Sequence, residues 1–254
     1  MTSDYFESAN MHKFDNKVVV VTGGGTGIGR ASTELFADNG AQVLIAGRRQ
    51  EPLAELSNLY PKNVSFIQAD VTDAEDRANI LQTAIERYGR IDALVNCAAL
   101  APDCAFQETT DEEFEKTYLT NLIAPASLIR LAIPHLSETK GAVVNVSTTM
   151  ARSKSPGATP YSCSKAALNH LTQVLAVELG PSGIRVNAVA PGPTKTEMAE
   201  DLIEKWGTET IVSMTPLGRL GEPSDIAKAV CFLASPDAEW VTGQILDSSG
   251  GFML

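Results

Sequence analysis

Short apolar, β-branched runs alternate along the chain with longer segments in which apolar residues recur at helical spacing. The apolar runs cover residues 17–22, 42–47, 64–70, 91–96, 141–147, 184–190 and 243–247. The helical pattern covers residues 27–39, 50–59, 73–89, 111–137, 160–179 and 223–234. Strands that alternate with helices in this way form a parallel sheet covered on both faces. The pattern predicts an α/β fold, a doubly wound parallel sheet of seven strands of the Rossmann type.

The continuity of this pattern predicts one domain. No internal repeat or low-complexity linker interrupts the chain, so residues 16–254 are assigned to the domain and residues 1–15 to an N-terminal extension. Ligands of doubly wound sheets bind beyond the carboxyl ends of the strands, near the point where the strand order reverses. Residues that directly follow a strand are therefore the candidates for binding and catalysis.

Composition restricts the partners and the location of the protein. The 254 residues are 44% hydrophobic and carry a formal net charge of −11, which disfavours nucleic acid because phosphate backbones bind basic surfaces. No run approaches the roughly 20 apolar residues of a membrane span, and the first residues do not resemble a signal peptide. We therefore expect a cytoplasmic protein that binds neither nucleic acid nor membrane.

Cysteine and histidine spacing predicts neither a metal site nor disulfides. Cys97, Cys104, Cys163 and Cys231 form no C-x-x-C pair, and the three histidines are scattered along the chain. Zinc sites and disulfide frameworks depend on regular, paired spacing. Four reduced thiols and no metal are expected.

A glycine-rich stretch, TGGGTGIGR, directly follows the first predicted strand and opens a predicted helix. Glycines in this context allow a tight turn and a close approach of the backbone to a pyrophosphate, and the helix N-terminus offers unpaired N–H groups to anionic oxygens. No Gly-Lys-[Ser/Thr] sequence follows, which disfavours a triphosphate site. The stretch predicts a dinucleotide site that includes Gly23, Gly25, Thr26, Gly27, Ile28 and Gly29.

The end of the second predicted strand bears on the choice of dinucleotide. An acidic residue about 20 residues beyond the glycine turn would bind the adenosine ribose of NAD. This chain has Gly47 there, followed by Arg48 and Arg49, whose guanidinium groups can hold a 2′-phosphate bidentately. The pattern favours NADP over NAD, with the alternative that both arginines simply begin a solvated helix and leave the choice open.

The sequence YSCSK places Tyr161 and Lys165 one turn apart on one face of a predicted helix. This spacing alone also occurs on ordinary helix surfaces. A nicotinamide cofactor carries a hydride, so the protein must move a proton to or from the substrate oxygen. A tyrosine pKa near 10 would have to fall by about 2–3 units for that work near neutral pH, and the charge of Lys165 would supply part of the shift.

Several motifs occur in a fixed order after the glycine turn. They are ADVT with Asp70, NCAA at 96–99, Asn121, YSCSK, PGPTKT at 191–196, PLGRLGEPSDIA at 216–227 and VTGQILDSSGGF at 241–252. In this order they resemble the motifs of the short-chain dehydrogenase/reductase family, over nearly the whole chain. The resemblance implies an NAD(P)-dependent oxidoreductase acting on a small carbonyl or secondary alcohol. It also implies cofactor contacts by Asp70, Val71, Asn96, Cys97, Ala98, Tyr161, Lys165, Pro191, Gly192, Thr194 and Thr196.

The same resemblance implies the catalytic residues. Tyr161 is the general acid/base, Lys165 lowers its pKa and bonds the nicotinamide ribose, and Asn121 holds a water in a proton relay. The family also places a hydroxyl thirteen residues before the tyrosine, usually a serine, and this chain has Thr148 there. Threonine keeps the hydroxyl, although its methyl group fills more space. Ser147 is the alternative, but side chains alternate along a strand and should turn it to the other face.

The turn NCAA departs from the family pattern at two positions. Cys97 and Ala99 stand where the family has asparagine and glycine. If that glycine has a positive φ or admits backbone close to the cofactor, Ala99 brings strain on the order of 1 kcal/mol or a shifted turn. No base is placed beside Cys97 in the sequence, so a packing role is expected for its thiol.

The segment from about residue 193 to 216 corresponds to a mobile substrate lid in the family. Met198, Trp206 and Met214 are candidate pocket residues, with ordinary packing as the alternative. Relatives form tetramers through the two long helices and the C-terminal strands, so a homotetramer or homodimer is expected.

Two other functions remain open from sequence. A 3-oxoacyl-[acyl-carrier-protein] reductase would dock an acidic carrier with basic residues near the ends of the long helices. This chain has only Lys140 there, against Glu138 and Glu178. The other alternative is a cofactor-bound binding or regulatory protein without catalysis, which the substitution at Thr148 motivates and the retained Tyr161 opposes.

Overall fold

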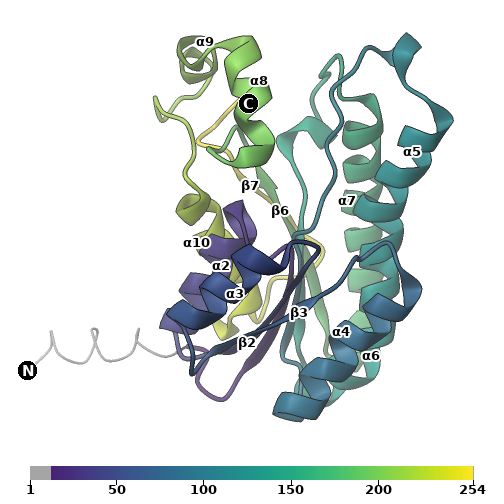
Figure 1. Ribbon diagram of the computed structural model, residues 1–254, viewed down its shortest axis with the longest axis vertical. Helices are drawn as coiled ribbons and strands as arrows, with labels where there is room; N and C mark the ends of the chain where they lie inside the picture. Colours follow the sequence, from purple (N-terminus) through teal and green to yellow (C-terminus); the bar gives the residue numbers. More distant parts are fainter. Residues whose placement is uncertain (1–12, 254) are drawn as a thin grey trace, which may run out of the picture.

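The chain forms three layers, a parallel sheet between two layers of helices (Figure 1). The computed structural model describes residues 13–253. The sheet order is β3-β2-β1-β4-β5-β6-β7, and every neighbouring pair is parallel. This confirms the predicted fold, with strand ends shifted by a residue or two. The strands are β1 (Val18–Thr22), β2 (Gln42–Gly47), β3 (Val64–Gln68), β4 (Ala93–Asn96), β5 (Ala142–Val146), β6 (Arg185–Pro191) and β7 (Ile245–Ser248).

Helices cover both faces of the sheet. Figure 1 shows α2, α3 and α10 on one side and α4, α6 and α7 on the other. Each predicted helix is present within a residue or two, except that residues 111–139 divide into α5, a π-helical turn and α6. The α-helices are α2 (Gly27–Asp38), α3 (Gln50–Leu59), α4 (Ala74–Tyr88), α5 (Asp111–Tyr118), α6 (Ala124–Thr139), α7 (Thr159–Leu179), α8 (Glu200–Trp206), α9 (Thr208–Ser213) and α10 (Pro223–Ala234).

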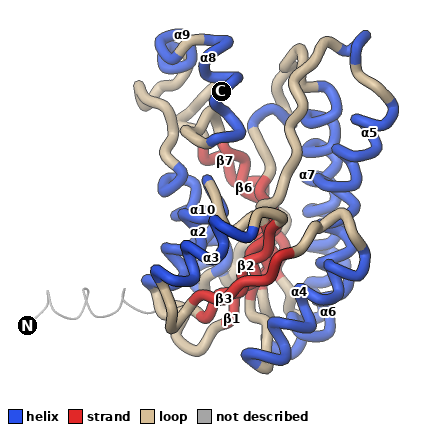
Figure 2. The backbone as a smooth tube through the Cα atoms, viewed as in Figure 1, coloured by secondary structure: helices blue, strands red, loops and turns tan. Residues whose placement is uncertain are grey.

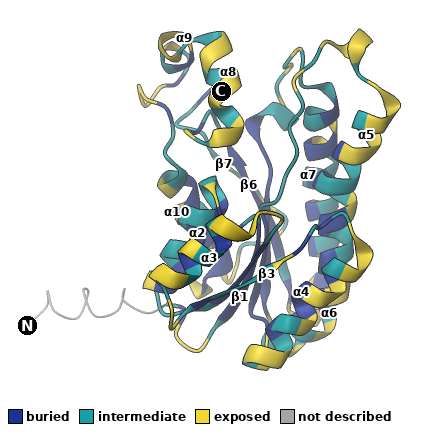
Figure 3. Cartoon of the chain, in the orientation of Figure 1, coloured by how far each residue is buried: buried dark blue, intermediate teal, exposed yellow. Residues whose placement is uncertain are grey.

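The burial of both sheet faces explains why the strand sequences are largely apolar. Val19 and Val21 of β1 pack in the core beneath α2, α3 and α10, with Phe36 among their neighbours. Val20, between them, packs in the opposite core, which includes Ile80 and Leu128. Alternate side chains of a strand point to opposite faces, so a sheet covered on both faces favours apolar residues at successive positions. The buried layer is the dark centre of Figure 3.

The strand order reverses between β1 and β4. The chain runs outward from β1 to β2 and β3, then returns to pair β4 with the other edge of β1. Figure 2 shows the loops that follow the strands gathered at one end of the sheet. The glycine turn after β1 and the 96–99 turn after β4 therefore lie together at the crevice where doubly wound sheets bind ligands.

The described part of the predicted N-terminal extension packs on the domain. Phe14 is buried, and its ring lies 4.9 Å from that of Phe36 in an edge-to-face arrangement. Residues 1–12 of that extension lie outside the described residues.

Asp111–Thr139 is long and apolar enough to cross a membrane by length and composition, a property that the sequence reading did not single out. In the fold it is a helix that covers the sheet. Leu128, Ile129 and Leu136 are buried in the core shared with β1, β4 and β5. A core helix of a globular protein meets the same criterion, so the helix does not indicate a membrane span.

The segment after β6 contains two short helices, α8 and α9, that the sequence pattern did not predict. They stand at one end of the molecule, beside the carboxyl ends of β6 and β7 (Figure 1). Ile211, Leu220 and Phe252 form a small apolar cluster beneath them, and Trp206 and Met214 pack against it. The segment therefore has a small core of its own, which includes Phe252 from the end of the chain.

Candidate active site

A cleft of about 1240 Å³ runs along the carboxyl ends of the strands, between the glycine turn and the segment that carries α8 and α9. This volume exceeds the roughly 300–1,000 Å³ of ordinary ligand pockets, so a dinucleotide and a second small molecule can share it. The predicted site residues line the cleft, except Gly29, Asn96 and Asn121, which lie behind its wall. The tertiary structure therefore brings the predicted cofactor and catalytic residues to one place.

The glycine turn is shaped by positions where a side chain would collide with backbone. Gly23 has a φ of +68°, and a Cβ there would lie 2.9 Å from the backbone nitrogen of Ala98. A Cβ on Gly29 would lie 2.1 Å from the carbonyl oxygen of Gly23. Thr26 precedes α2 without capping it through its side chain, and the first turn of α2 has no acidic residue. The first amides of α2 therefore face the cleft without a side-chain acceptor, as an anion site requires.

Basic residues mark the far end of the cleft. Arg48 and Arg49 are exposed at the end of β2 and line the cleft, and the guanidinium of Arg49 donates to both carboxylate oxygens of Glu197 at 3.0 and 2.7 Å. Asp70 lies opposite. Burial would raise the pKa of Asp70, but hydrogen bonds from the backbone and hydroxyl of Thr72 and the charge of Arg48 hold it below its usual value.

Two residues that sequence did not single out hold the 96–99 turn. The hydroxyl of Thr22, at the end of β1, accepts hydrogen bonds from the backbone of Cys97 and Ala98 at 3.2 and 3.3 Å. The buried amide of Asn96 donates to the side-chain oxygen of Asn145 at 2.8 Å. Thr22 lies inside the quoted glycine stretch, and Asn145 lies in a strand run, but only strand pairing shows that either faces the β4 turn.

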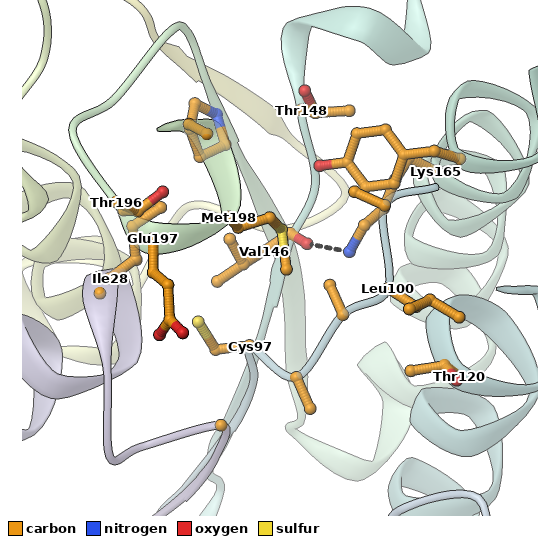
Figure 4. A pocket seen from close by; sticks show the side chains of 18 of the residues that line it. Ile28, Cys97, Leu100, Thr120, Val146, Thr148, Lys165, Thr196, Glu197 and Met198 are labelled. Carbon is orange, nitrogen blue, oxygen red and sulfur yellow. Dashed lines mark hydrogen bonds between the residues drawn. The ribbon is translucent and has the colours of Figure 1, made fainter. Parts of the chain in front are cut away.

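Tyr161, Thr148 and Lys165 lie together beside β5. Figure 4 shows Thr148 and Lys165 on one wall of the pocket. The Thr148 side chain lies close enough to the Tyr161 phenol to oppose the rise in its pKa, whereas the Ser147 hydroxyl is buried without a described partner. Between the two alternatives weighed from sequence, the structure thus places Thr148 beside the phenol. The Thr148 hydroxyl also accepts from the backbone of Met150 at 3.2 Å, which orients it.

The ammonium of Lys165 does not act on Tyr161 as the sequence led us to expect. Its Nζ donates to the carbonyl oxygen of Val146 at 2.7 Å, the dashed line in Figure 4. Burial raises the pKa of Tyr161 to about 12, and the hydrogen bond with Thr148 opposes that rise. Burial likewise lowers the pKa of Lys165 to about 8. The expected fall in the tyrosine pKa is therefore absent from the protein alone, because desolvation dominates and the charge of Lys165 does not contribute to the shift.

Asn121 is buried behind the cleft, and its side chain binds the backbone of the loop after β4. Its oxygen accepts from the nitrogen of Leu100 at 2.9 Å, and its amide donates to the carbonyl of Leu100 at 2.8 Å and to Ser164 at 3.0 Å. It lies in the π-helical turn Leu119–Ile123, an irregularity common at functional sites. The side-chain amide is thus occupied in positioning the loop after β4.

The two departures in the NCAA turn cause little disturbance. Ala99 does not have a positive φ, so the backbone strain expected there does not occur. Burial raises the pKa of the Cys97 thiol to about 11, against the opposing charge of Lys165. The thiol is protonated at neutral pH, as a packing role requires.

The segment over the cleft is tied to both walls. Lys205 of α8 forms an ion pair of 2.8 Å with Asp103 on the loop after β4, and Glu197 pairs with Arg49 on the opposite side. Met198 and Trp206 line the cleft, as weighed from sequence, whereas Met214 belongs to the apolar cluster under α9. These acidic and basic partners are distant in sequence, and no local pattern joins them.

The residues present fit a nicotinamide dinucleotide. The uncapped start of α2 suits a pyrophosphate, and the basic end of the cleft suits the adenosine half. Lys165 and Tyr161 lie at the other end, where the nicotinamide half would reach. When bound, such a cofactor supplies a hydride donor or acceptor.

Fold and site together define a dinucleotide-binding α/β oxidoreductase. A family model described as Enoyl-(Acyl carrier protein) reductase matches residues 23–253. The chain is 36% identical over 246 residues to 3-oxoacyl-[acyl-carrier-protein] reductase of Thermotoga maritima, covering 95% of this chain and 100% of that one. It is 40% identical to 3alpha-hydroxysteroid dehydrogenase of Mediterraneibacter gnavus, covering 92% and 96%.

A solved structure titled short-chain dehydrogenase/reductase SDR:Glucose/ribitol dehydrogenase, from Brucella melitensis, matches with a TM-score of 0.92 and 33% identity, covering 96% of this chain and 99% of that one. The chain belongs to the short-chain dehydrogenase/reductase family, as its motifs indicated. It is an oxidoreductase that acts on CH–OH or C=O groups with a nicotinamide cofactor.

Proposed function

We propose that this enzyme transfers a hydride between NADP(H) and a small, uncharged carbonyl or secondary-alcohol substrate, with Tyr161 as the general acid/base. The observation that carries the proposal is that Tyr161, Thr148 and the buried Lys165 line the same cleft. In the reducing direction the phenol gives its proton to the substrate oxygen while the carbonyl carbon receives the hydride. Thr148 orients that oxygen by a hydrogen bond.

The raised pKa of Tyr161, about 12, favours the role of acid over that of base. A phenol with this pKa keeps its proton at neutral pH and can deliver it to a carbonyl oxygen. Oxidation of an alcohol would need the phenolate, which Lys165 can stabilise only when its ammonium turns from Val146 toward the phenol.

NADP is the proposed cofactor because the end of β2 carries Arg48 and Arg49 and lacks a carboxylate at Gly47. Guanidinium groups bind phosphates bidentately, while an acid there would repel a 2′-phosphate. The water relay suggested for Asn121 would use its backbone carbonyl, since its side chain is occupied by Leu100.

The lining of the substrate end supports an uncharged substrate. Leu100, Met150 and Trp206 contribute apolar surface, and the one lysine of α8 is paired with Asp103. The names of two relatives, which specify 3-oxoacyl and hydroxysteroid substrates, both point to ketones and secondary alcohols.

A carrier-linked 3-oxoacyl substrate is the second candidate, favoured by the likeness to a 3-oxoacyl-[acyl-carrier-protein] reductase. Acidic residues at the cleft mouth, among them Glu112, Glu115 and Asp201, would repel an acidic carrier. Comparing turnover of a carrier-linked 3-oxoacyl chain with that of its free thioester tests this. A large advantage for the carrier-linked form would support the second candidate.

Exposed apolar side chains on the long helices and near β7 support the homo-oligomer that we propose. The cytoplasmic location stays a prediction from the sequence.

The decisive test of the function is Tyr161→Phe. We expect turnover of a ketone panel with NADPH to fall by about 10²–10⁴-fold, the usual contribution of a general acid. Binding of NADPH, followed by its fluorescence, should change little because the phenyl ring remains. Thr148→Ser, which keeps the hydroxyl, is the matched control and should retain activity. Full turnover by Tyr161→Phe would instead support a mechanism that does not use this phenol, and a wild type without turnover over the whole panel would support the non-catalytic alternative.

A further inference from the structure

Glu197 begins the segment over the cleft and reaches across it. It follows Thr196, whose methyl group lies 3.2 Å from where a Cβ on Gly27 would stand, so the base of this segment sits directly on the glycine turn. In Figure 4 the Glu197 carboxylate hangs into the space between Ile28 and Cys97, on the opposite side of the pocket from Lys165. It ends at Arg49, 148 residues earlier in the chain.

The contact occupies the donors that a phosphate would use. Nη1 and Nη2 of Arg49 donate to the two oxygens of Glu197 at 3.0 and 2.7 Å. A guanidinium presents these donors as a fixed fork that holds a carboxylate or a phosphate in the same bidentate manner. The Nη1 and Nη2 protons that bind Glu197 cannot bind a phosphate at the same time, and a phosphate on the remaining Nε edge would lie close to the Glu197 carboxylate, which repels it. Arg48, by contrast, forms no ion pair with another described residue.

The pair is weak enough to be exchanged. The side chains of Arg49 and Glu197 are 57% and 66% exposed, and exposed ion pairs contribute little to stability. A phosphate carries more charge than a carboxylate and can displace it. A dinucleotide without the 2′-phosphate offers Arg49 no such replacement.

We propose that Glu197 is a specificity-determining residue for the cofactor. It competes with the 2′-phosphate for Arg49 and so weakens the binding of NADPH relative to that of NADH. Binding of NADPH exchanges the Arg49–Glu197 pair for an Arg49–phosphate pair and unties the segment over the cleft on that side. Binding of NADH leaves the pair in place. This inference rests on the proposed nicotinamide function, and its test separates the two.

The experiment measures dissociation constants of NADPH and NADH by fluorescence titration at constant, low ionic strength, without substrate. We expect Glu197→Gln to raise the ratio of the NADH constant to the NADPH constant by about two- to fivefold, the range of one exposed ion pair. Asp201→Asn is the matched control, because Asp201 is an exposed acid of the same segment that lines the same cleft. It removes an equal charge and should leave the ratio unchanged.

A double-mutant cycle identifies the partner. The double variant Arg49→Met/Glu197→Gln should have the same ratio as Arg49→Met alone, because the guanidinium for which Glu197 and the phosphate compete is absent. The inference is overturned if Glu197→Gln leaves the ratio unchanged, or if Asp201→Asn changes it equally. In either case, binding of NADPH by the wild type still supports the proposed function. If the wild type binds NADH better and Glu197→Gln shifts it toward NADPH, the inference stands and the proposed NADP preference falls. Failure of the wild type to bind either dinucleotide ends both.

Discussion

Lys165 carries its charge in the protein interior, where burial of a charged group is unfavourable. Its side chain is almost fully buried, and the hydrogen bond to the Val146 carbonyl is the one that its ammonium makes among the described residues. Burial accordingly lowers its pKa to about 8. A structural role does not require a buried ammonium, since an apolar residue of similar length would fill the same space. The buried ammonium therefore lowers stability, which accords with the catalytic role proposed for Lys165.

Replacing Lys165 by methionine should therefore stabilise the fold at neutral pH. The folded pKa is lower than the ordinary 10.5, so the burial penalty is complete below about pH 8 and is relieved as the pH rises toward 10.5. We expect Lys165→Met to raise the free energy of unfolding at pH 7 by on the order of 1–3 kcal/mol, reduced by the lost bond to Val146. Urea unfolding at several pH values measures it.

The pH trend is the diagnostic part of that prediction. The advantage of Lys165→Met should shrink between pH 8 and 10, as wild-type Lys165 loses its proton. Tyr161 titrates with the opposite sign, since its raised pKa gives stability that is complete below about pH 10 and lost toward pH 12, so the comparison stops at pH 10. Lys62→Met, at an exposed lysine, should show no such trend. A constant difference at every pH would contradict the account.

At the residue scale, the sequence predicted which residues form the site better than it predicted their interactions. Spacing from Tyr161 led to Thr148, and the structure places Thr148 in the same cleft as Tyr161. The direction of the Tyr161 pKa was wrong, because a sequence shows the charge of Lys165 but not how far both groups are removed from water. Thr22 and Asn145 were missed because their partners belong to other strands.

At the scale of elements, the turn from β1 into α2 sets the shape of the cleft. The close contact between Gly29 and the carbonyl of Gly23 lets α2 pack against the end of β1. The helix consequently begins at the cleft with its first amides free of side-chain acceptors.

Alanine substitutions at two glycines of this turn should differ sharply. A Cβ on Gly29 would lie 2.1 Å from the Gly23 carbonyl oxygen, so backbone has to move. A Cβ on Gly25 would lie 3.2 Å from a side-chain carbon of Leu53, which can shift. We expect Gly29→Ala to cost about 2–3 kcal/mol of unfolding free energy and Gly25→Ala less than about 1 kcal/mol, measured by denaturant unfolding. Equal costs would mean that the turn adapts as a whole.

Long elements were predictable and short ones were not. The strands and the main helices follow from periodicity, which is a local property of the sequence. α8 and α9 have 7 and 6 residues, too few to be stable in isolation. They are held by the cluster of Ile211, Leu220 and Phe252, which joins parts of the chain that sequence reading treats separately.

At the scale of the whole molecule, apolar side chains remain exposed on two surfaces. Ile123 and Val177 lie on the long helices, with 50% and 78% of their surface exposed. Phe232 and Trp240 lie near β7, and Trp240 is 98% exposed. A tryptophan so fully exposed is unusual on a monomer, which motivates the proposed homo-oligomer.

Disrupting these surfaces one at a time should lower the mass in steps. If both surfaces pair copies of the chain, the wild type elutes as a tetramer, and either Val177→Glu or Trp240→Ser leaves a dimer through the other surface. Size-exclusion chromatography with light scattering measures the mass. Leu59→Ser, at an exposed apolar residue of α3, is the control and should not change it. A monomeric wild type would show that neither surface pairs at the concentration used.

The sequence by itself determined the order of strands and helices, the place of the glycine turn and which residues follow each strand, because apolar periodicity and glycine position act over neighbouring residues. Only the tertiary structure decided which of these residues meet. Strand pairing brings Thr22 to the 96–99 turn, burial sets the pKa values of Tyr161 and Lys165, and the segment after β6 folds back so that Glu197 reaches Arg49. Burial and charge pairing depend on distances between residues far apart in the chain, which no local pattern contains.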